Sequence, residues 1–226
     1  MAKVKTSKKT TPKHQTGEHI ICLYDDLMEL EDASLAFLNE GLDRGEKCIC
    51  LNCPNKPDSY YQFLVDNVVS QPVKPNQLAF IDATDVYLNK NRLDPLHMII
   101  FLMRKLREAS LEGYKSTRYI MDMGWTGFDD WGLLDCEALL NKYLIPYFSC
   151  TLLCGYNLER LNPRLLREIA INHPQVMRSD RVVNNRYFAP PRPFLAYSEG
   201  KDSLEHLMEI IDRDLKKQSQ TPFKAG

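Results

Sequence analysis

The sequence lacks long hydrophobic runs, a secretory leader and a dense set of cysteines, and each absence excludes a class of protein. A membrane-spanning helix needs about 18 apolar residues in succession, and no stretch comes near that length. The Lys-rich start has no apolar core, so it does not read as a secretory signal peptide. Seven cysteines are too few for a disulfide-stapled secreted fold. We therefore expect a cytoplasmic protein with reduced thiols and no membrane partner.

A strong overall charge is also missing, because 29 basic and 30 acidic residues nearly cancel. Residues 1–16 are the exception, since they contain five lysines and no acid. Serine, threonine and proline separate these lysines, so the segment is predicted to be a disordered basic arm. The alternative is a tail that binds nucleic acid. We expect no nucleic-acid binding except through this arm.

What the sequence does contain is a globular composition, with 44% hydrophobic and 26% charged residues, and five short apolar runs. The runs are continuous rather than alternating, which is typical of strands buried on both faces. They span His19–Tyr24, Lys47–Asn52, Leu78–Asp82, Arg118–Met123 and Cys150–Tyr156.

Amphipathic segments separate these runs and predict helices. The first carries apolar residues from Leu27 to Leu42 and ends before Gly45, where the chain turns back. Another begins with Asp94 as N-cap and Pro95 in the first turn, and ends at Glu112. The remaining helices are predicted at Pro57–Ser70, Asp135–Leu144 and Pro163–Ile171.

This alternation of strands and helices predicts a single three-layer α/β domain over residues 17–195. Its sheet is expected to be mainly parallel and flanked by helices, with right-handed crossovers. A further helix is predicted at 200–218, followed by a tail at 219–226.

A phosphate-binding loop is absent from the position where this architecture would carry one. Such a loop has the pattern GxxxxGK[ST] after a strand and cradles phosphates with backbone N–H groups. The residues that follow the first run are instead Asp25-Asp26-Leu27-Met28-Glu29, without glycine or lysine and with three acids. No catalytic Ser-His-Asp or Cys-His arrangement stands out either. We therefore expect no catalytic residues, no cofactor and no enzymatic activity.

Candidate binding residues lie at the carboxyl ends of the predicted strands, where open parallel sheets bind ligands. Asp122 ends the fourth strand, and Trp125 and Phe128 follow it closely. One interpretation is an apolar, aromatic pocket wall with an acid that fixes a polar group. The alternative is that the two rings belong to the ordinary core and that Asp122 caps a helix.

The cysteines at Cys48, Cys50 and Cys53 have a spacing that suggests a metal site. On a strand, however, Cys48 and Cys50 share one face within an apolar run, and no second CxxC or HxxxH unit accompanies them. Buried structural thiols are therefore favoured, and no metal site is expected. Cys53, at the strand end, is a weak candidate for a redox sensor.

Several fragments between about residues 18 and 191 form a pattern in their order and spacing. They are Glu18-His19 with Tyr24, Phe37-Leu38-x-x-Gly41-Leu42-x-x-Gly45-Glu46, Leu93-Asp94-Pro95, Gly113-Tyr114, Met121-Asp122-Met123-x-Trp125, Glu137-Ala138-x-x-Asn141, Cys154-x-Tyr156, His173-Pro174 and Asn184-Asn185-x-Tyr187. Together they resemble the MEDS domain, the sensory domain of methanogen and methylotroph regulators such as the dichloromethane-responsive repressor.

The resemblance implies a RecA-like fold, related to the KaiC clock ATPases but without a phosphate loop. It also implies a sensory module for small molecules such as hydrocarbon or C1-type compounds, often joined to DNA-binding, PAS or histidine-kinase domains. No such output domain is expected in this chain. One departure is that the family usually has Gly-Glu-Met-x-Trp where this sequence has Met121-Asp122-Met123-Gly124-Trp125. The acid is thus one carbon shorter, which could change ligand choice.

The leading hypothesis is a non-catalytic sensor that binds a small molecule and signals to a regulator, a sensor kinase or a second copy of itself. Its ligand-binding residues are predicted to be Tyr24, Asp122, Trp125, Tyr156, His19 and Glu46. One alternative is a degenerate RecA-like nucleotide-binding protein or ATPase that uses Asp122. The other is a redox or metal sensor built on Cys48, Cys50 and Cys53.

Overall fold

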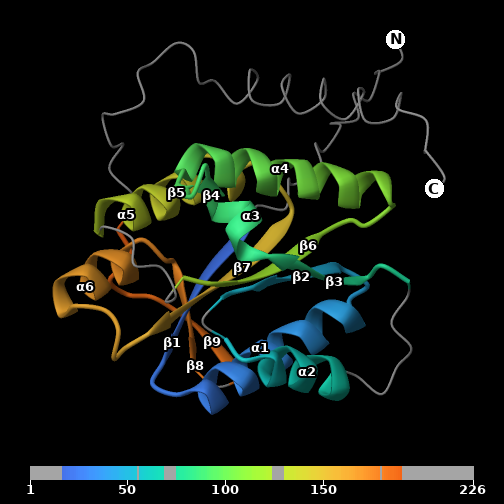
Figure 1. Cartoon of the computed structure of the whole chain (residues 1–226), viewed down its shortest axis with the longest axis horizontal. Helices are drawn as coiled ribbons and strands as arrows, with labels where there is room; N and C mark the ends of the chain where they lie inside the picture. Colours follow the sequence, from blue (N-terminus) through green and yellow to red (C-terminus); the bar gives the residue numbers. More distant parts are fainter. Residues whose placement is uncertain (1–16, 55, 69–74, 124–129, 179, 190–226) are drawn as a thin grey trace, which may run out of the picture.

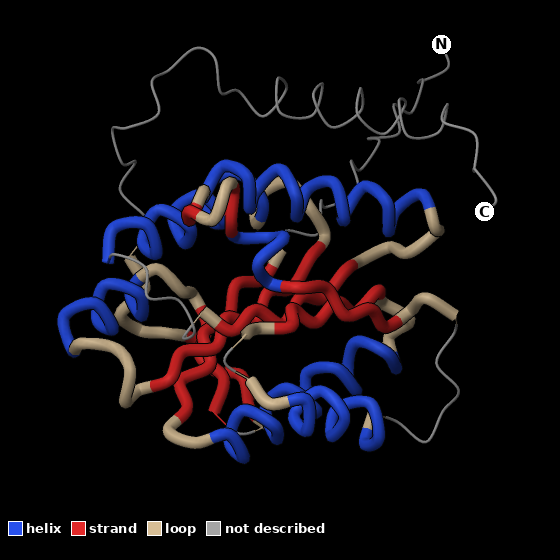
Figure 2. Tube along the Cα trace, in the orientation of Figure 1, coloured by secondary structure: helices blue, strands red, loops and turns tan. Residues whose placement is uncertain are grey.

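A computed structural model of the chain describes residues 17–54, 56–68, 75–123, 130–178 and 180–189. Within them, one sheet lies between two layers of helices (Figures 1 and 2). The predicted three-layer α/β fold is therefore confirmed. The predicted basic arm at 1–16, the helix at 200–218 and the tail at 219–226 lie outside the described residues, as do residues 190–195 of the predicted domain. No helix in the described part of the chain is long and apolar enough to cross a membrane.

The main sheet has seven strands in the order β3-β2-β6-β7-β1-β8-β9. Its neighbours pair in parallel except for the hairpin of β8 and β9. Five of its strands coincide with the predicted runs to within one residue at each end. They are β1 (Glu18–Tyr24), β2 (Lys47–Asn52), β3 (Leu78–Asp82), β6 (Thr117–Asp122) and β7 (Cys150–Asn157).

Helices cover both faces of this sheet. One face carries α1 (Leu27–Asp43) and α2 (Asp58–Asn67). The opposite face carries α3 (Ala83–Tyr87), α4 (Pro95–Leu111), α5 (Asp130–Leu139), a π-helical turn (Leu140–Leu144) and α6 (Pro163–Ile171). The helix predicted at Asp135–Leu144 thus begins five residues earlier and ends in the π-helical turn.

The sequence analysis did not predict four short strands and helix α3. The strands are β4 (Leu88–Asn89), β5 (Arg92–Leu93), β8 (Gln175–Arg178) and β9 (Arg181–Asn184). The hairpin of β4 and β5 turns on Lys90 and Asn91, which both have positive φ. Strand β9 is exposed along its whole length, so it has no apolar run by which a buried strand can be recognised.

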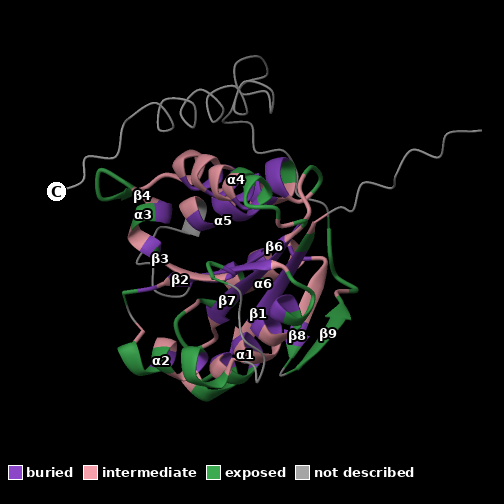
Figure 3. Ribbon diagram, turned by 90° about the vertical axis from the view of Figure 1, so that its right-hand side faces the viewer, coloured by how far each residue is buried: buried purple, intermediate pink, exposed green. Residues whose placement is uncertain are grey.

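Side chains along each strand alternate between two separate cores, one under each layer of helices. The strands in the middle of the sheet are largely buried between these layers (Figure 3). The core under α1 and α2 contains Ile20, Cys22, Tyr24, Cys48, Cys50, Ile120 and Leu153. The core under the helices of the other face contains Ile21, Ile49, Leu51, Tyr119, Met121, Leu152, Cys154 and Tyr156. Residues an odd number of positions apart on one strand therefore face different helical layers. This alternation decides which candidate residues can meet.

Helix α4 begins where predicted, and its N-cap allows a test of local stability. The Oδ1 atom of Asp94 accepts a hydrogen bond from the backbone N–H of His97 at 2.9 Å, and Asn89 Nδ2 donates to Oδ2 at 2.9 Å. Replacing an N-cap acid by alanine costs about 1 kcal/mol. We expect Asp94→Ala to lower the free energy of unfolding by about that amount in urea denaturation. Asp94→Asn should retain most of the cap. The exposed mid-helix change Asp32→Ala is the control, and equal losses in all three variants would contradict this role.

Candidate functional site

The six predicted ligand-binding residues do not form one pocket in the structure. Tyr24 and Asp122 contact each other at the carboxyl edge of the sheet, on the face of α1 and α2. His19 and Tyr156 lie on the opposite face, in the second core. Glu46 precedes β2 at the amino end of the strands. Trp125 lies outside the described residues.

At the carboxyl edge, Tyr24, Lys56 and Asp122 form a buried group, the edge cluster. The Tyr24 hydroxyl donates to the two Asp122 carboxylate oxygens at 3.0 and 3.2 Å. Lys56 Nζ lies 2.8 Å from Asp122 Oδ2 and donates to the Tyr24 oxygen at 2.8 Å. The Lys56 and Asp122 side chains are only 7% and 5% exposed. The Lys56 ammonium group therefore balances the Asp122 carboxylate inside the protein.

Gly155 makes the contact between Tyr24 and Asp122 possible. Strand β7 lies between β1 and β6, so the Tyr24 side chain must cross β7 to reach Asp122. At the crossing point, a Cβ atom on Gly155 would lie 3.5 Å from Tyr24 Cε1 and 3.3 Å from Leu30 Cδ1. The space above the strand is therefore filled by the ring, and any side chain longer than a methyl group would displace it.

The N-terminus of α1, directly after β1, is already occupied by carboxylates. Asp26 Oδ1 accepts from the backbone N–H of Glu29 at 2.9 Å, and Glu29 Oε2 accepts from the backbone N–H of Asp25 at 2.9 Å. The first bond is that of an N-cap, and the second returns to Asp25, the residue before the N-cap. Both bonds occupy backbone N–H groups at the start of the helix, which leaves fewer of them to bind a phosphate.

Cys53 lies next to the edge cluster but is a poor redox site. Its thiol is 3% exposed and donates to the backbone carbonyl oxygens of Leu51 and Asp122 at 3.5 and 3.3 Å. Burial raises the pKa of this thiol well above its ordinary value, and the Asp122 charge raises it further. Reactive cysteines need the opposite, a partly exposed thiol with a lowered pKa. All seven cysteines are buried and free, including Cys48 and Cys50.

A second buried group, the histidine cluster, consists of His19, Glu137, Cys154 and His173. All four residues are inaccessible to solvent. Glu137 Oε2 lies 3.0 Å from His19 Nε2 and 3.1 Å from His173 Nε2. The Cys154 Sγ atom lies 3.3 Å from His19 Nε2. The two imidazole rings are 4.0 Å apart between centroids.

Neighbouring groups fix the orientation of each member of the histidine cluster. His19 Nδ1 lies 3.0 Å from Asn141 Oδ1, and His173 Nδ1 lies 2.9 Å from the backbone carbonyl oxygen of Ile169. The Tyr156 hydroxyl donates a hydrogen bond to Oε1, the other carboxylate oxygen of Glu137. Both Nε2 atoms and Glu137 Oε2 therefore point toward one another.

The electrostatics of the histidine cluster follow from complete burial. Burial lowers the pKa of His19, and the neighbouring His173 lowers it further. Burial alone would raise the pKa of Glu137, but His173 and His19 outweigh it and hold this pKa below its ordinary value. Burial raises the pKa of the Cys154 thiol well above its ordinary value, and Glu137 adds to this effect.

The sequence analysis did not select Lys56, Glu137 or His173 as site residues. For Glu137 and His173 a signal was present, because both belong to fragments that carry the family resemblance. The fragments that contain His19, Glu137, Cys154 and His173 come from four separate parts of the chain and meet in this cluster. Lys56 had no signal of its own, since it is a single lysine in a short loop after β2.

Glu46 serves a different purpose at the amino end of the strands. It forms an ion pair with Nε of Arg118, and Arg118 Nη1 contacts Glu40 Oε2 at 2.8 Å. The Arg118 side chain is 2% exposed and lies against the ring of Phe37. Gly41 gives it room, because a Cβ at that position would lie 2.5 Å from Arg118 Cδ. The contacts of Glu46 in the structure are therefore those of a buried ion pair.

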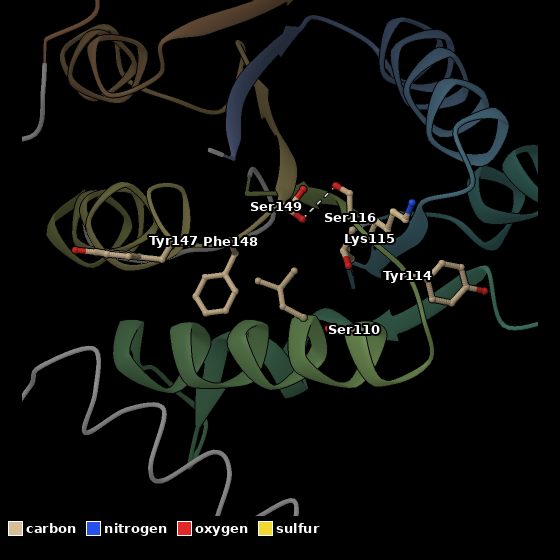
Figure 4. Close-up of a pocket in the computed structure, with 9 residues that line it drawn as sticks. Ser110, Tyr114, Lys115, Ser116, Tyr147, Phe148 and Ser149 are labelled. Atoms are coloured by element: carbon tan, nitrogen blue, oxygen red, sulfur yellow. Dashed lines mark hydrogen bonds between the residues drawn. The ribbon is translucent and has the colours of Figure 1, made fainter. Parts of the chain in front are cut away.

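A cavity of about 150 Å³ opens at the same amino-terminal edge of the sheet (Figure 4). Ser116 Oγ donates to the Ser149 carbonyl oxygen at 3.1 Å on its wall. The cavity is lined by Leu106, Ser110, Tyr114, Lys115, Ser116, Thr117, Tyr147, Phe148 and Ser149. None of the six predicted ligand-binding residues lines it. Glu46 lines a neighbouring cavity of about 80 Å³.

The fold and the edge cluster define a class: a three-layer α/β domain with a buried lysine–aspartate pair at the carboxyl edge of its sheet. The chain belongs to the family described as MEDS, the MEthanogen/methylotroph, DcmR Sensory domain, whose model matches residues 18–174. The resemblance stated from the sequence is thereby confirmed, and the family indicates a sensory, signal-input role.

Among solved structures, the chain is similar to the flagellar accessory protein FlaH from Methanocaldococcus jannaschii. The two share 9% sequence identity over 75% of each chain, with a TM-score of 0.40. A comparison with curated proteins gives no match.

Proposed function

We propose that this chain is a non-catalytic sensor that binds a small, uncharged, polar molecule at the edge cluster and signals to a protein partner or a second copy of the chain. The observation that carries the proposal is the buried pairing of Lys56 with Asp122, with Tyr24 bonded to both. Hydrogen-bonding groups converge at the sheet edge where ligands bind in this architecture.

Charge balance at the edge cluster supports an uncharged ligand. Lys56 and Asp122 already neutralise each other, so a charged ligand would leave one buried charge without a partner. Such an unpaired charge is strongly unfavourable in a buried site. A nucleoside triphosphate would bring several negative charges next to Asp122 and the carboxylates of Asp26 and Glu29. An alcohol, an amide or a small halogenated hydrocarbon carries no charge. Such a compound would neither leave a buried charge without a partner nor be repelled by the carboxylates.

Asn52 offers a further hydrogen-bonding group at this edge. Among the described residues, its Oδ1 atom is buried without a hydrogen-bond partner. Asn52 ends β2, the neighbour of β6, on the same side of the sheet as Cys48 and Cys50 and hence on the side of Asp122. A buried carbonyl oxygen without a donor costs free energy. A ligand that donates one hydrogen bond to Asn52 would remove that cost.

The proposal is tested by thermal unfolding with small alcohols, amides and halogenated methanes, each against the unliganded chain. Ligand at about 100 times its dissociation constant adds about 2.7 kcal/mol to the stability. We expect at least one uncharged compound to raise the melting temperature of the wild type. We expect the charge-balanced double variant Lys56→Met/Asp122→Asn to lose that rise.

This experiment has two controls, a variant and a ligand. Lys105→Met breaks a half-buried pair with Glu108, far from the edge cluster in the fold, and should leave the response to the compound unchanged. ATP with Mg²⁺ should shift neither wild type nor variant. A shift with ATP and Mg²⁺ in the wild type alone would contradict the sensor proposal and favour the nucleotide-binding alternative. An unchanged response in the double variant would show that the compound binds elsewhere, for example in the cavity of Figure 4.

A further inference from the structure

We propose that the histidine cluster is a closed binding site for one divalent zinc-like metal ion, held by His19, His173, Glu137 and Cys154. The four candidate ligand atoms lie within 4.8 Å of one another, and all four residues are buried. This inference concerns the face of the sheet opposite the edge cluster and does not depend on the proposed function.

The distances fit a tetrahedral metal ion. Bonds of about 2.0–2.3 Å, as zinc makes to nitrogen, oxygen and sulfur, separate neighbouring ligand atoms by about 3.3–3.6 Å in a tetrahedron. The separations in the cluster are 3.0 Å and 3.1 Å for the two nitrogen–oxygen pairs and 3.3 Å for the nitrogen–sulfur pair. Outward movements of a few tenths of an ångström would bring these three separations to tetrahedral values, and the remaining pairs, all within 4.8 Å, would close by at most about 1.5 Å.

Two ligand atoms of the cluster have no hydrogen-bond partner, and a metal ion would bond to both. The Nδ1 atoms of His19 and His173 each face an oxygen acceptor, so in its neutral form each ring would carry its proton on Nδ1 and present a lone pair from Nε2. Both Nε2 atoms lie beside Glu137 Oε2, a carboxylate oxygen that can only accept hydrogen bonds. Among the described residues, Glu137 Oε2 and His173 Nε2 are buried without a hydrogen-bond partner. A cation placed among these atoms would be coordinated by all of them.

The surroundings of the cluster resemble those of established metal sites in their chemistry. Metal-bound histidines almost always donate their second ring N–H to a carbonyl or carboxylate, and metal-bound carboxylates accept further hydrogen bonds. Asn141 and the Ile169 carbonyl oxygen meet the first condition, and Tyr156 meets the second through Glu137 Oε1.

Charge and donor type select the metal. One carboxylate and one thiolate balance a divalent cation, and two neutral imidazoles complete the set, so a buried site would carry no net charge. Two nitrogens, one oxygen and one sulfur in a tetrahedral arrangement suit zinc better than calcium or magnesium, which prefer oxygen ligands. Binding would transfer the Cys154 proton to solvent as the thiolate bonds to the metal.

The ion would join separate parts of the fold. His19 and Cys154 belong to the neighbouring strands β1 and β7, Glu137 to α5, and His173 to the loop after α6. Coordination would fasten these helices to the sheet, so removal of the metal should loosen this face.

The test uses Co²⁺ as a spectroscopic substitute for Zn²⁺, added to the full chain after treatment with a chelator. We expect binding to saturate at one Co²⁺ per chain, with d–d bands of a tetrahedral ion and a thiolate-to-cobalt charge-transfer band that Zn²⁺ then abolishes. Cys154→Ser should lose the charge-transfer band. The matched control is Cys150→Ser, which lies on the same strand and the same face outside the cluster. Asn141→Ala should weaken binding by about 10–100-fold.

Two results would overturn the proposal. One is wild-type protein that takes up no Co²⁺ and whose melting temperature is the same with chelator and with Zn²⁺, which would leave a purely hydrogen-bonded cluster. The other is a charge-transfer band that persists in folded Cys154→Ser. If Cys154→Ser fails to fold, the Co²⁺ titration of the wild type still tests the metal site. Lys56→Met/Asp122→Asn should bind Co²⁺ as the wild type does, which separates this inference from the proposed function.

Discussion

Arg118→Met is expected to destabilise the chain by about 3–5 kcal/mol, since it removes one partner of a buried ion pair. Arg118 is 2% exposed, and its guanidinium bonds to Glu46, to Glu40 and to the backbone carbonyl oxygen of Phe37 at 3.2 Å. Methionine fills most of the space but satisfies none of these acceptors. The Glu46 carboxylate, 12% exposed, would be left without its cation.

Arg44→Met is the matched control for this experiment. Arg44 pairs with the same Glu40 carboxylate, but on the surface, where the two side chains are 59% and 47% exposed. A surface pair at this helical spacing contributes only about 0.3–0.5 kcal/mol. Urea denaturation of the two variants should therefore give losses that differ by several-fold. Similar losses would show that burial does not decide the strength of the Arg118 interactions.

Glu137→Leu should destabilise metal-free protein by about 1–3 kcal/mol, because it leaves a buried hydrogen-bond donor unsatisfied. The carboxylate lies between His19 and His173 and accepts a hydrogen bond from the Tyr156 hydroxyl, and none of it reaches solvent. Leucine leaves that buried hydroxyl donor without an acceptor. Glu137→Gln retains an acceptor oxygen, so we expect its stability to lie between those of wild type and Glu137→Leu.

Denaturation in the presence of a chelator measures this effect apart from any bound metal. Glu159→Gln, an exposed position, serves as the control and should change the free energy of unfolding little. If Glu137→Leu were as stable as the wild type, the hydrogen bond from Tyr156 to the buried carboxylate would contribute nothing to stability. If the order of the Leu and Gln variants were reversed, the hydrogen bond from Tyr156 would not be the interaction that matters.

The division of the six predicted ligand residues between two faces could have been foreseen. His19 and Tyr24 are five positions apart on one strand, and an odd separation places them on opposite faces. The sequence analysis grouped residues by their nearness to strand ends and did not apply this alternation. The same rule, applied to Cys48 and Cys50, correctly placed both in one buried core.

Other contacts could not be derived from the chain order. Lys56 reaches Asp122 from a short loop 66 positions earlier, and His173 reaches Glu137 from the loop after α6. Arg118 stands inside an apolar run and is recognisable as part of a strand. Its guanidinium is buried against the Phe37 ring because Gly41 leaves room for the side chain, and this contact is visible only in the tertiary structure.

The sequence by itself determined the fold class, the bounds of the five strands β1, β2, β3, β6 and β7, and the lack of a phosphate loop. These properties depend on local patterns: continuous apolar runs, helix caps such as Asp94, and the residues that directly follow the first strand. Only the tertiary structure decided which polar groups meet. The edge cluster and the histidine cluster each join residues from separate elements, and burial makes their pairing obligatory because a buried charge or hydrogen-bonding group needs a partner.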